Sequence, residues 1–195
     1  MTGKTHIAIG MAAGLTIAFG RPFEEQLTLV LASAIGSLIP DLDHPKGRLN
    51  QRLLLINNNL YRALFYLSLA SICMYLYFTR GSKILMFLGI VSSLIGISSH
   101  RSFTHSIIGF LTAASIVGLG TLNYGLYSIY SGFIVGYILH LVADFFTSKG
   151  IKLFYPINTN VSFPFTIKTN GKLEKILFRL LSIYSICLLL QYLEI

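Results

Sequence analysis

The 195-residue chain contains no tryptophan, only two cysteines and only seven acidic residues, and these shortages exclude several kinds of protein. Cys73 and Cys187 lie in separate apolar stretches without CxxC spacing, so we expect neither a disulfide framework nor a thiolate zinc site. Charged residues make up 11% of the chain and hydrophobic residues 54%, and the mean hydropathy is +0.70. This composition leaves too little polar surface to cover a soluble globule, which places the chain in a lipid bilayer.

Apolar runs of helical length recur along the whole sequence. A transmembrane helix needs roughly 20 predominantly apolar residues. Four runs have 17 to 19 residues, whereas the first two are clearly shorter. The runs cover residues 7–20, 27–39, 60–78, 84–99, 106–122, 126–143 and 176–193. We therefore predict an all-α, polytopic transmembrane bundle of about six or seven helices, in one domain covering residues 1–195. The first two helices either span with the help of flanking residues or form a shallow hairpin.

The basic residues are unevenly distributed between the connections. If the N-terminus is cytoplasmic and all seven runs cross, twelve Lys and Arg fall on the cytoplasmic side and three on the other. Because positively charged flanks resist translocation, this predicts a multi-pass protein of the cytoplasmic (inner) membrane with a cytoplasmic N-terminus. The same topology accounts for the net charge of +8, and we recognise no nucleic-acid-binding module. The basic loop 149–175 is then a solvated cytoplasmic loop, or a lid whose aromatic residues lie on the headgroups.

All five histidines and all three aspartates are confined to four short polar motifs. They are His6, Asp41, Asp43, His44, His100, His105, His140 and Asp144. Imidazole and carboxylate groups bind divalent metals, and an ionised group at bilayer depth costs on the order of 2.5 to 3.5 kcal/mol. All four motifs fall on the predicted cytoplasmic side. Because that orientation is assigned from Lys and Arg alone, the shared location of the His and Asp motifs is an independent observation. We therefore predict one shared metal site at the cytoplasmic end of the bundle.

Local spacing supports convergence within two of these motifs. His140 and Asp144 are four residues apart, so their side chains share one helix face and can bind one ion. Pro40 and Pro45 bracket residues 41–44, which predicts that the preceding helix ends there and that the segment forms a non-helical turn.

A helix break is predicted between His100 and His105, because residues five apart do not share a face of a continuous helix. A break near residues 101–104 lets both imidazoles turn inward, with Thr104 capping the helix that follows. Elsewhere, the pairs Gly10-xxx-Gly14 and Gly132-xxx-Gly136 predict close helix packing.

The four motifs together resemble those of a known family. They are Thr5-His6, Pro40-Asp41-Leu42-Asp43-His44-Pro45, His100-Arg101-Ser102-Phe103-Thr104-His105-Ser106, and the stretch from Gly136-Tyr137 through His140, Asp144 and Thr147 to Gly150. The combination resembles the bacterial and archaeal family of inner-membrane metal-dependent hydrolases, one branch of which is regulated by the SOS repressor. The resemblance covers residues 5–156 and leaves 157–195 as a basic loop plus a C-terminal helix. It implies a membrane-bound hydrolase whose metal or catalytic residues are these eight His and Asp side chains.

The donor set also indicates a reaction class. Eight nitrogen and oxygen donors exceed the three protein ligands that one catalytic zinc usually takes, which favours two divalent ions. Such donors admit Zn, Mn, Fe or Mg, of which we favour Zn. A two-metal site suits phosphoester hydrolysis by a metal-activated water, with Arg101, Ser102 and Thr104 holding the phosphate. We predict Asp43, His105 and Arg101 as catalytic residues, membrane lipids as partners, and a lipid-like phosphoester as substrate.

Other functions remain open on the same residues. No Glu occurs in the motifs, which excludes a His-Glu-x-x-His protease, but an aspartate base would still permit peptide hydrolysis. A divalent-metal transporter or a metal-binding sensor is the main alternative. Transport paths place ionisable residues near the middle of the membrane, whereas these motifs gather at one end. A purely structural membrane protein would leave the histidines unexplained, and the sequence leaves the oligomeric state open.

Overall fold

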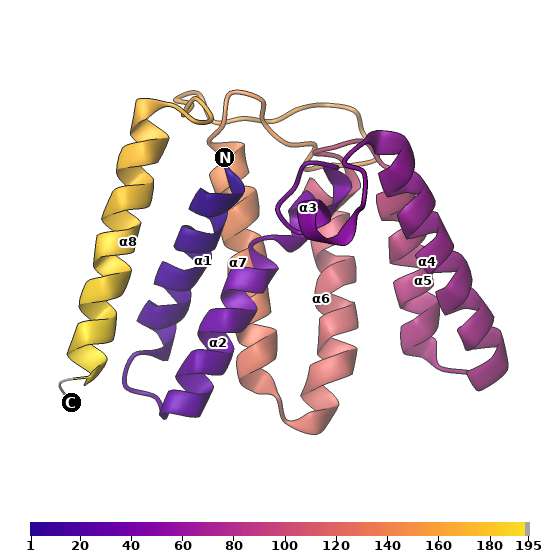
Figure 1. Ribbon diagram of the computed structural model, residues 1–195, viewed down its shortest axis with the longest axis horizontal. Coiled ribbons are helices and arrows are strands. Elements are labelled where there is room, and N and C mark those ends of the chain that lie inside the picture. The colour runs from indigo at the N-terminus through magenta and orange to yellow at the C-terminus, as the bar shows by residue number, and fades with distance from the viewer. Residues whose placement is uncertain (194–195) are drawn as a thin grey trace.

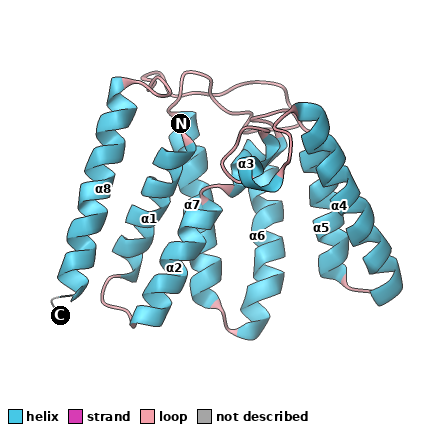
Figure 2. Ribbon diagram, in the orientation of Figure 1, coloured by secondary structure: helices cyan, strands magenta, loops and turns pink. Residues whose placement is uncertain are grey.

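The computed structural model describes residues 1–193. Within this range the chain is helical, with loops and two isolated β-bridges but no named strand, which confirms the all-α prediction (Figure 2). The elements are α1 (Gly3–Ala18), α2 (Phe23–Gly36), η1 (Ile39–Asp43), α3 (Asn50–Leu53), α4 (Asn59–Arg80), α5 (Lys83–Ile97), η2 (Phe103–His105), α6 (Ile107–Thr121), η3 (Leu122–Tyr124), α7 (Tyr127–Phe145) and α8 (Lys172–Leu193), where η marks a short 3₁₀ helix.

Successive long helices run in alternating directions, so one end of the bundle collects the segments that carry the polar motifs (Figure 1). The start of α1, the end of α2 with η1, the connection from α5 to α6 and the end of α7 all lie at this end. The loop between α7 and α8 crosses the same end. The fold therefore brings the four motifs together, as the sequence predicted.

Three of the described helices are long and apolar enough to cross a membrane: α4, α6 with its η3 extension, and α7. The helix α5 is apolar but shorter, with 15 residues. The helices α1 and α2, with 16 and 14 residues, are also short, in line with the short apolar runs from which they were predicted. The full count of six or seven crossings stays a prediction.

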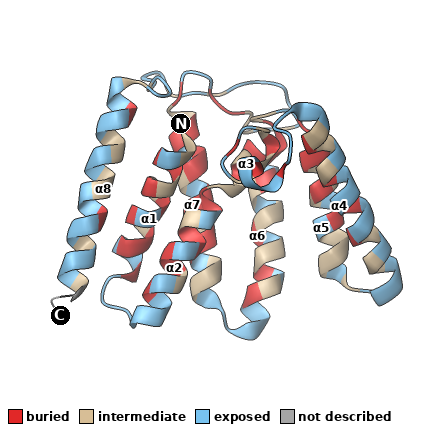
Figure 3. Cartoon of the chain, viewed as in Figure 1, coloured by how far each residue is buried: buried red, intermediate tan, exposed pale blue. Residues whose placement is uncertain are grey.

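Small residues set the packing of the central helices. Helix α2 contacts both α1 and α7, and buried residues concentrate in these three helices (Figure 3). A Cβ on Gly10 of α1 would come within 2.7 Å of the Ser33 carbonyl oxygen, and a Cβ on Gly136 of α7 would overlap the same carbonyl. Glycine is therefore required on both sides of α2, which confirms that the predicted glycine pairs mark close helix contacts.

The hairpin of α4 and α5 lies at one side of this core (Figure 1). A buried arginine attaches it at the end of the bundle that carries the polar motifs. Arg62 of α4 donates from Nη1 to the carbonyl of Asp43 and from Nη2 to the carbonyl of Ser98, at 2.9 Å for the second bond. One guanidinium thus joins η1, the end of α5 and α4. On the opposite side, α8 packs against α1.

Candidate metal centre

The first group of possible ligands is fully buried between α1 and α7. It consists of His6, His140 and Asp144, whose donor atoms lie within 4.8 Å of one another. Nε2 of His6 lies 3.2 Å from Oδ1 of Asp144, and the His6 and His140 rings stack with centroids 3.8 Å apart. The four-residue spacing on α7 places His140 and Asp144 on one face, as predicted. We call this the deep group.

The second group is held by short segments rather than long helices. It consists of Asp41 of η1, His100 of the loop after α5, and His105 of η2, again with donor atoms within 4.8 Å. His105 is fully buried, whereas Asp41 and His100 are partly exposed. We call this the shallow group.

The two groups touch and form a continuous cluster. Nε2 of His105 lies 3.1 Å from Nε2 of His140 and 3.6 Å from Oδ2 of Asp144. Oδ1 of Asp41 lies 4.0 Å from both imidazole Nε2 atoms. Metal–nitrogen bonds of about 2.0 to 2.1 Å in a tetrahedral site separate neighbouring donors by roughly 3.3 Å. The spacings at the junction are therefore short enough for donors of one ion or of two neighbouring ions.

Asp43 lies outside both groups but beside the shallow one. Its carboxylate accepts hydrogen bonds from Nδ1 of His100 at 2.8 Å, from the hydroxyl of Thr104 at 2.7 Å and from the backbone N–H of Arg101 at 2.9 Å. Nδ1 of His105 is 3.3 Å away. Burial alone would raise the pKa of Asp43, but His105 and His100 hold it well below its usual range. This carboxylate orients the two imidazoles of the shallow group.

Three of the imidazoles, those of His100, His105 and His140, have the arrangement usual for metal ligands, in which Nδ1 is held by a polar partner and Nε2 faces the cluster. Nδ1 of His140 lies 2.7 Å from the Ser37 carbonyl, to which it can donate, so that Nε2 faces the cluster. Both ring nitrogens of His6 are buried without a hydrogen-bond partner among residues 1–193, since the Asp144 contact lacks hydrogen-bond geometry. A buried polar atom without a partner is costly. The nitrogen and oxygen donors therefore fit a divalent ion.

The electrostatics around His105 also favour a cation. Burial alone lowers the pKa of His105, but the charge of Asp43 and hydrogen bonds to Asp144 and Asp43 raise it to about 10. Asp144 itself contacts the Met1 ammonium and, at 3.1 Å, Nη2 of Arg101. Cations thus already meet the carboxylates at the junction of the two groups, and a metal ion there would take the place of one of them or of the imidazole proton.

Two predictions about the local backbone are wrong. The segment after α2 is one short 3₁₀ helix, Ile39–Asp43, rather than a non-helical turn. Proline is compatible with the first turn of a helix, because the N–H that it lacks has no partner there. Thr104 does not cap α6; Ser106 does, accepting from the N–H of Gly109 at 3.0 Å, because the Thr104 hydroxyl is bound to Asp43. The predicted break between the two histidines is confirmed.

Arg101 lies at the bend of this break with a φ of 64°, a left-handed conformation that is uncommon for a residue with a side chain. The conformation lets its N–H donate to Asp43 while its guanidinium binds Asp144, the Thr147 hydroxyl and the Gly150 carbonyl. The hydroxyls of Ser102 and Thr104, proposed above as phosphate ligands, are buried and hydrogen-bonded inside the protein. Of these three residues, only Arg101 lines the cavity described below.

His44 lies beside the shallow group without belonging to it. Its Nδ1 accepts from the N–H of Lys46 at 3.1 Å, and its ring meets the His100 ring edge-on at 4.3 Å. Partial burial and the neighbouring His100 lower the pKa of His44. Of the eight predicted ligands, six lie in the two groups and two, Asp43 and His44, lie next to them.

Three polar residues around the site were not recognised from the sequence. Besides Arg62, they are Asn50 and Glu174. The Asn50 amide donates to the carbonyls of Leu42 and His44, both at 2.8 Å, and its oxygen accepts from the Tyr66 hydroxyl at 2.7 Å. Glu174 of α8 accepts from Thr2 and Thr5 at the start of α1. These residues lie outside the His and Asp motifs, and nothing in the sequence sets them apart from other polar residues of the loops and helix ends.

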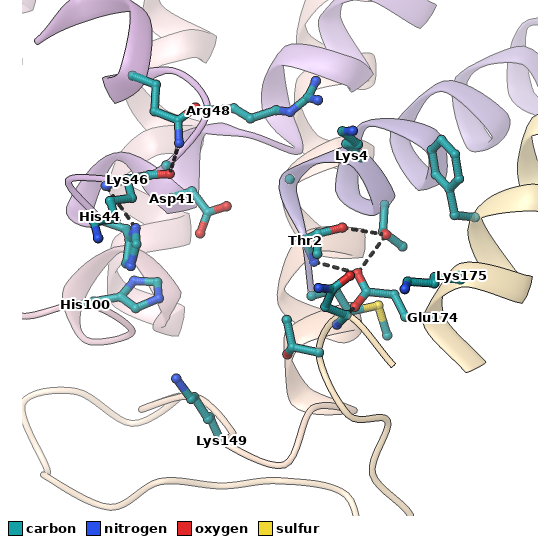
Figure 4. A pocket seen from close by; sticks show the side chains of 18 of the residues that line it. Thr2, Lys4, Asp41, His44, Lys46, Arg48, His100, Lys149, Glu174 and Lys175 are labelled. Atoms are coloured by element: carbon teal, nitrogen blue, oxygen red, sulfur yellow. Dashed lines mark hydrogen bonds between the residues drawn. The ribbon is translucent and has the colours of Figure 1, made fainter. Parts of the chain in front are cut away.

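A cavity of about 810 Å³ opens above the shallow group (Figure 4). Asp41, His44 and His100 lie along one wall, while Thr2, Glu174 and Lys175 lie along the other, and Lys149 approaches from the α7–α8 loop. His6, His105, His140 and Asp144 do not line it. A molecule in the cavity would therefore meet Asp41 and His100 before any other member of the two groups.

These features define a helical membrane protein with a buried His and Asp cluster beneath a polar cavity. The chain belongs to the YdjM inner membrane protein family, whose model matches residues 1–193. It is 27% identical over 185 residues to the uncharacterized protein YvsG of Bacillus subtilis (strain 168), covering 95% of this chain and 92% of the relative. It is 24% identical over 200 residues to the inner membrane protein YdjM of Escherichia coli (strain K12), covering 95% and 82%. No solved structure matches the chain.

The family assignment agrees with the membrane location predicted from composition. It extends the expected core of residues 5–156 through the basic loop and α8. Neither the family description nor the relatives' names state a reaction or a bound metal.

Proposed function

We propose that this protein is a membrane-bound metal-dependent hydrolase that cleaves a phosphoester at the cytoplasmic face of the inner membrane. The observation that carries the proposal is the junction of the two ligand groups, where the Nε2 atoms of His105 and His140 lie 3.1 Å apart. Six donors from four separate parts of the chain converge there, in a protein that has only eight His and Asp residues. Packing alone would not concentrate them in this way.

Each group would hold one divalent ion, with zinc the ion that the imidazole-rich donor set favours. Two such ions, when bound, supply a water nucleophile at neutral pH and stabilise the attacking and leaving oxygens of a phosphoester. His6, His140 and Asp144 are the proposed ligands of the deep ion, and Asp41, His100 and His105 those of the shallow ion.

The remaining residues of the motifs have supporting roles in this proposal. Asp43 holds His100 and His105 by their Nδ1 atoms, so that Nε2 of each is free to bind an ion. Arg101 balances the charge of Asp144 at 3.1 Å and fixes it against Thr147. Asp41 is partly exposed in the cavity, where it can also accept a proton from the attacking water. In this assignment Asp43 positions the ligands, and the base is Asp41.

The surroundings of the site support the proposed reaction class. The cavity over the shallow group is lined by basic side chains, which favours a substrate with negative charge. A phosphoester brings that charge, and its non-bridging oxygens are good ligands for a pair of ions. The apolar helices below the cavity keep the reacting group at the membrane surface, which fits a substrate embedded in the membrane.

The test begins with elemental analysis of protein purified in detergent. We expect about two divalent ions per chain in the wild type and about one in His6→Ala or His100→Ala protein. His44→Ala, a histidine outside both groups, is the matched control and should retain the wild-type metal content. Activity is then measured on panels of phosphoester and acyl-ester substrates. A protein that binds metal and transports it into proteoliposomes, but hydrolyses neither panel, would establish the transporter alternative and overturn the hydrolase.

A further inference from the structure

The wall of the cavity carries an excess of positive charge that the metal ligands do not explain. Six basic side chains line it besides Arg101: Lys4, Lys46, Arg48, Lys149, Lys175 and Arg179. All six are exposed. None of them lies within 4 Å of a carboxylate in the part of the chain that the structure describes. The only acidic residues of the lining are Asp41 and Glu174.

The two acidic residues of the lining leave this charge unbalanced. Glu174 is engaged by the N–H groups of Thr2 and Asn170 and by the Thr5 hydroxyl. Asp41 belongs to the shallow group, where a bound metal ion would neutralise the charge of its carboxylate. The cavity is therefore strongly cationic with or without metal in the site.

The basic side chains come from separate parts of the chain that surround the cavity. Lys4 lies on α1, Arg48 on the turn before α3, Lys149 on the loop after α7, and Lys175 on α8 (Figure 4). The Arg48 side chain packs against the start of α1. A Cβ built on Gly3 of α1 would lie 3.0 Å from Cγ of Arg48. Basic residues that only mark the cytoplasmic side need no such arrangement.

We propose that this cavity binds a phosphate-type group with two or more negative charges, such as a phosphomonoester or diphosphate headgroup, in preference to a zwitterionic one. The inference rests on the proposed function, which places the bond to be cleaved beside Asp41 and His100. A phosphocholine head brings a cation that the basic wall repels, whereas a doubly charged phosphate can be met from several sides at once.

Same-side basic residues outside the cavity provide the control. Arg52, Lys152, Lys168 and Lys172 share the end of the bundle but do not line the cavity. One variant combines Lys4→Gln, Arg48→Gln, Lys149→Gln and Lys175→Gln. The matched variant combines Arg52→Gln, Lys152→Gln, Lys168→Gln and Lys172→Gln. Both lose four positive charges from the same end of the protein, so they differ only in the place of the lost charge.

Binding is measured on chelator-treated protein in phosphatidylcholine nanodiscs, so that neither metal nor turnover contributes. One arm uses inorganic diphosphate in solution, and the other adds phosphatidic acid to the nanodisc. We expect the cavity variant to bind at least one of these probes about tenfold more weakly than the wild type, and the control within about twofold. Binding of diphosphate alone assigns a soluble source of the phosphate group, and binding of phosphatidic acid alone assigns a lipid.

Equal weakening in both variants would reduce the effect to general surface charge and overturn the inference. Wild-type affinity in the cavity variant, or no binding of either probe by the wild type, would overturn it as well. Thermal unfolding of the three proteins checks that the substitutions leave the fold intact, including that of Lys152, which is half-buried and donates to Asn158. If binding follows the expectation but the metal-loaded protein hydrolyses nothing, the cavity assignment stands and the hydrolase proposal fails. If the metal-loaded protein hydrolyses a substrate but binding does not depend on the basic side chains, the hydrolase proposal stands and the cavity assignment fails.

Discussion

The deep and shallow groups use the same side-chain types but are held in place by different means. His6, His140 and Asp144 project from long helices that approach each other through glycine contacts with α2. Asp41, His100 and His105 lie on short 3₁₀ segments and a loop. A hydrogen bond holds His100 against Asp43, and a charge contact of 3.3 Å holds His105 against the same carboxylate. Helix packing thus fixes the group that is sealed from solvent, whereas polar contacts fix the group that faces the cavity.

The largest effect should come from removing the residue that joins the groups. We expect His140→Ala to lose hydrolysis and at least one ion per chain, because His140 contacts His6, His105 and the Ser37 carbonyl. Metal content by elemental analysis and turnover of the active substrate are the measurements. His44→Ala should keep the wild-type metal content. Full metal content in His140→Ala protein would show that the ions do not bind at this junction.

A more selective change should separate the two groups. Asp43→Asn keeps the size of the side chain but loses the charge that orients His100 and His105. We expect the affinity of the shallow ion to fall on the order of 10- to 100-fold, with the deep ion unchanged. Competitive titration against a fluorescent chelator resolves the two ions. Glu25→Gln, which removes an exposed carboxylate at the other end of the bundle, is the control. Equal weakening of both ions would contradict the proposed division.

Helix packing should matter most for the deep group. Gly136→Ala would place a methyl group against the Ser33 carbonyl of α2, and we expect it to lower the free energy of unfolding by about 1 to 3 kcal/mol. Thermal or denaturant unfolding in detergent measures this. Gly120→Ala is the matched control, because a Cβ there meets no atom within 4 Å. Similar stability of the two variants would mean that α2 and α7 are not packed this closely.

The smallest effect should come from a hydroxyl behind the shallow group. Tyr66 donates to Asn50, which in turn holds the Leu42 and His44 carbonyls at 2.8 Å. We expect Tyr66→Phe to cost about 1 kcal/mol of stability and to speed release of the shallow ion to a chelator. Tyr75→Phe, an exposed tyrosine on the same helix, should do neither. Faster release of the deep ion and not of the shallow ion would show that the Tyr66–Asn50 hydrogen bonds do not support the shallow group.

The sequence predicted the parts of this protein that depend on local composition. Histidine and aspartate are costly in an apolar chain, so their positions indicated a shared site, and the alternation of apolar runs with basic connections indicated its end of the bundle. The glycine pairs likewise predicted helix contacts. The His and Asp signal is visible because these residue types are rare in this apolar chain.

The contacts that hold the site could not be predicted in the same way. Arg62 resembles any positive flank of a membrane helix, and Asn50 resembles any polar loop residue. Their partners, the carbonyls of residues 42, 43, 44 and 98, leave no mark in the sequence. The roles of Asp43 and Thr104 were also hidden, because the sequence shows that a carboxylate is present and not which groups donate to it.

The hydrogen bonds from Thr2 and Thr5 to Glu174 have a consequence for how the protein matures. The backbone of Thr2 and the Glu174 carboxylate are separated by 172 positions of sequence, yet they meet at 2.6 Å beside the cavity. During synthesis α1 is made long before α8, so one wall of the cavity is missing until α8 packs against α1. A chain interrupted before α8 would lack the wall of the cavity that Glu174 and Lys175 provide, so the cavity is completed only when translation is nearly finished.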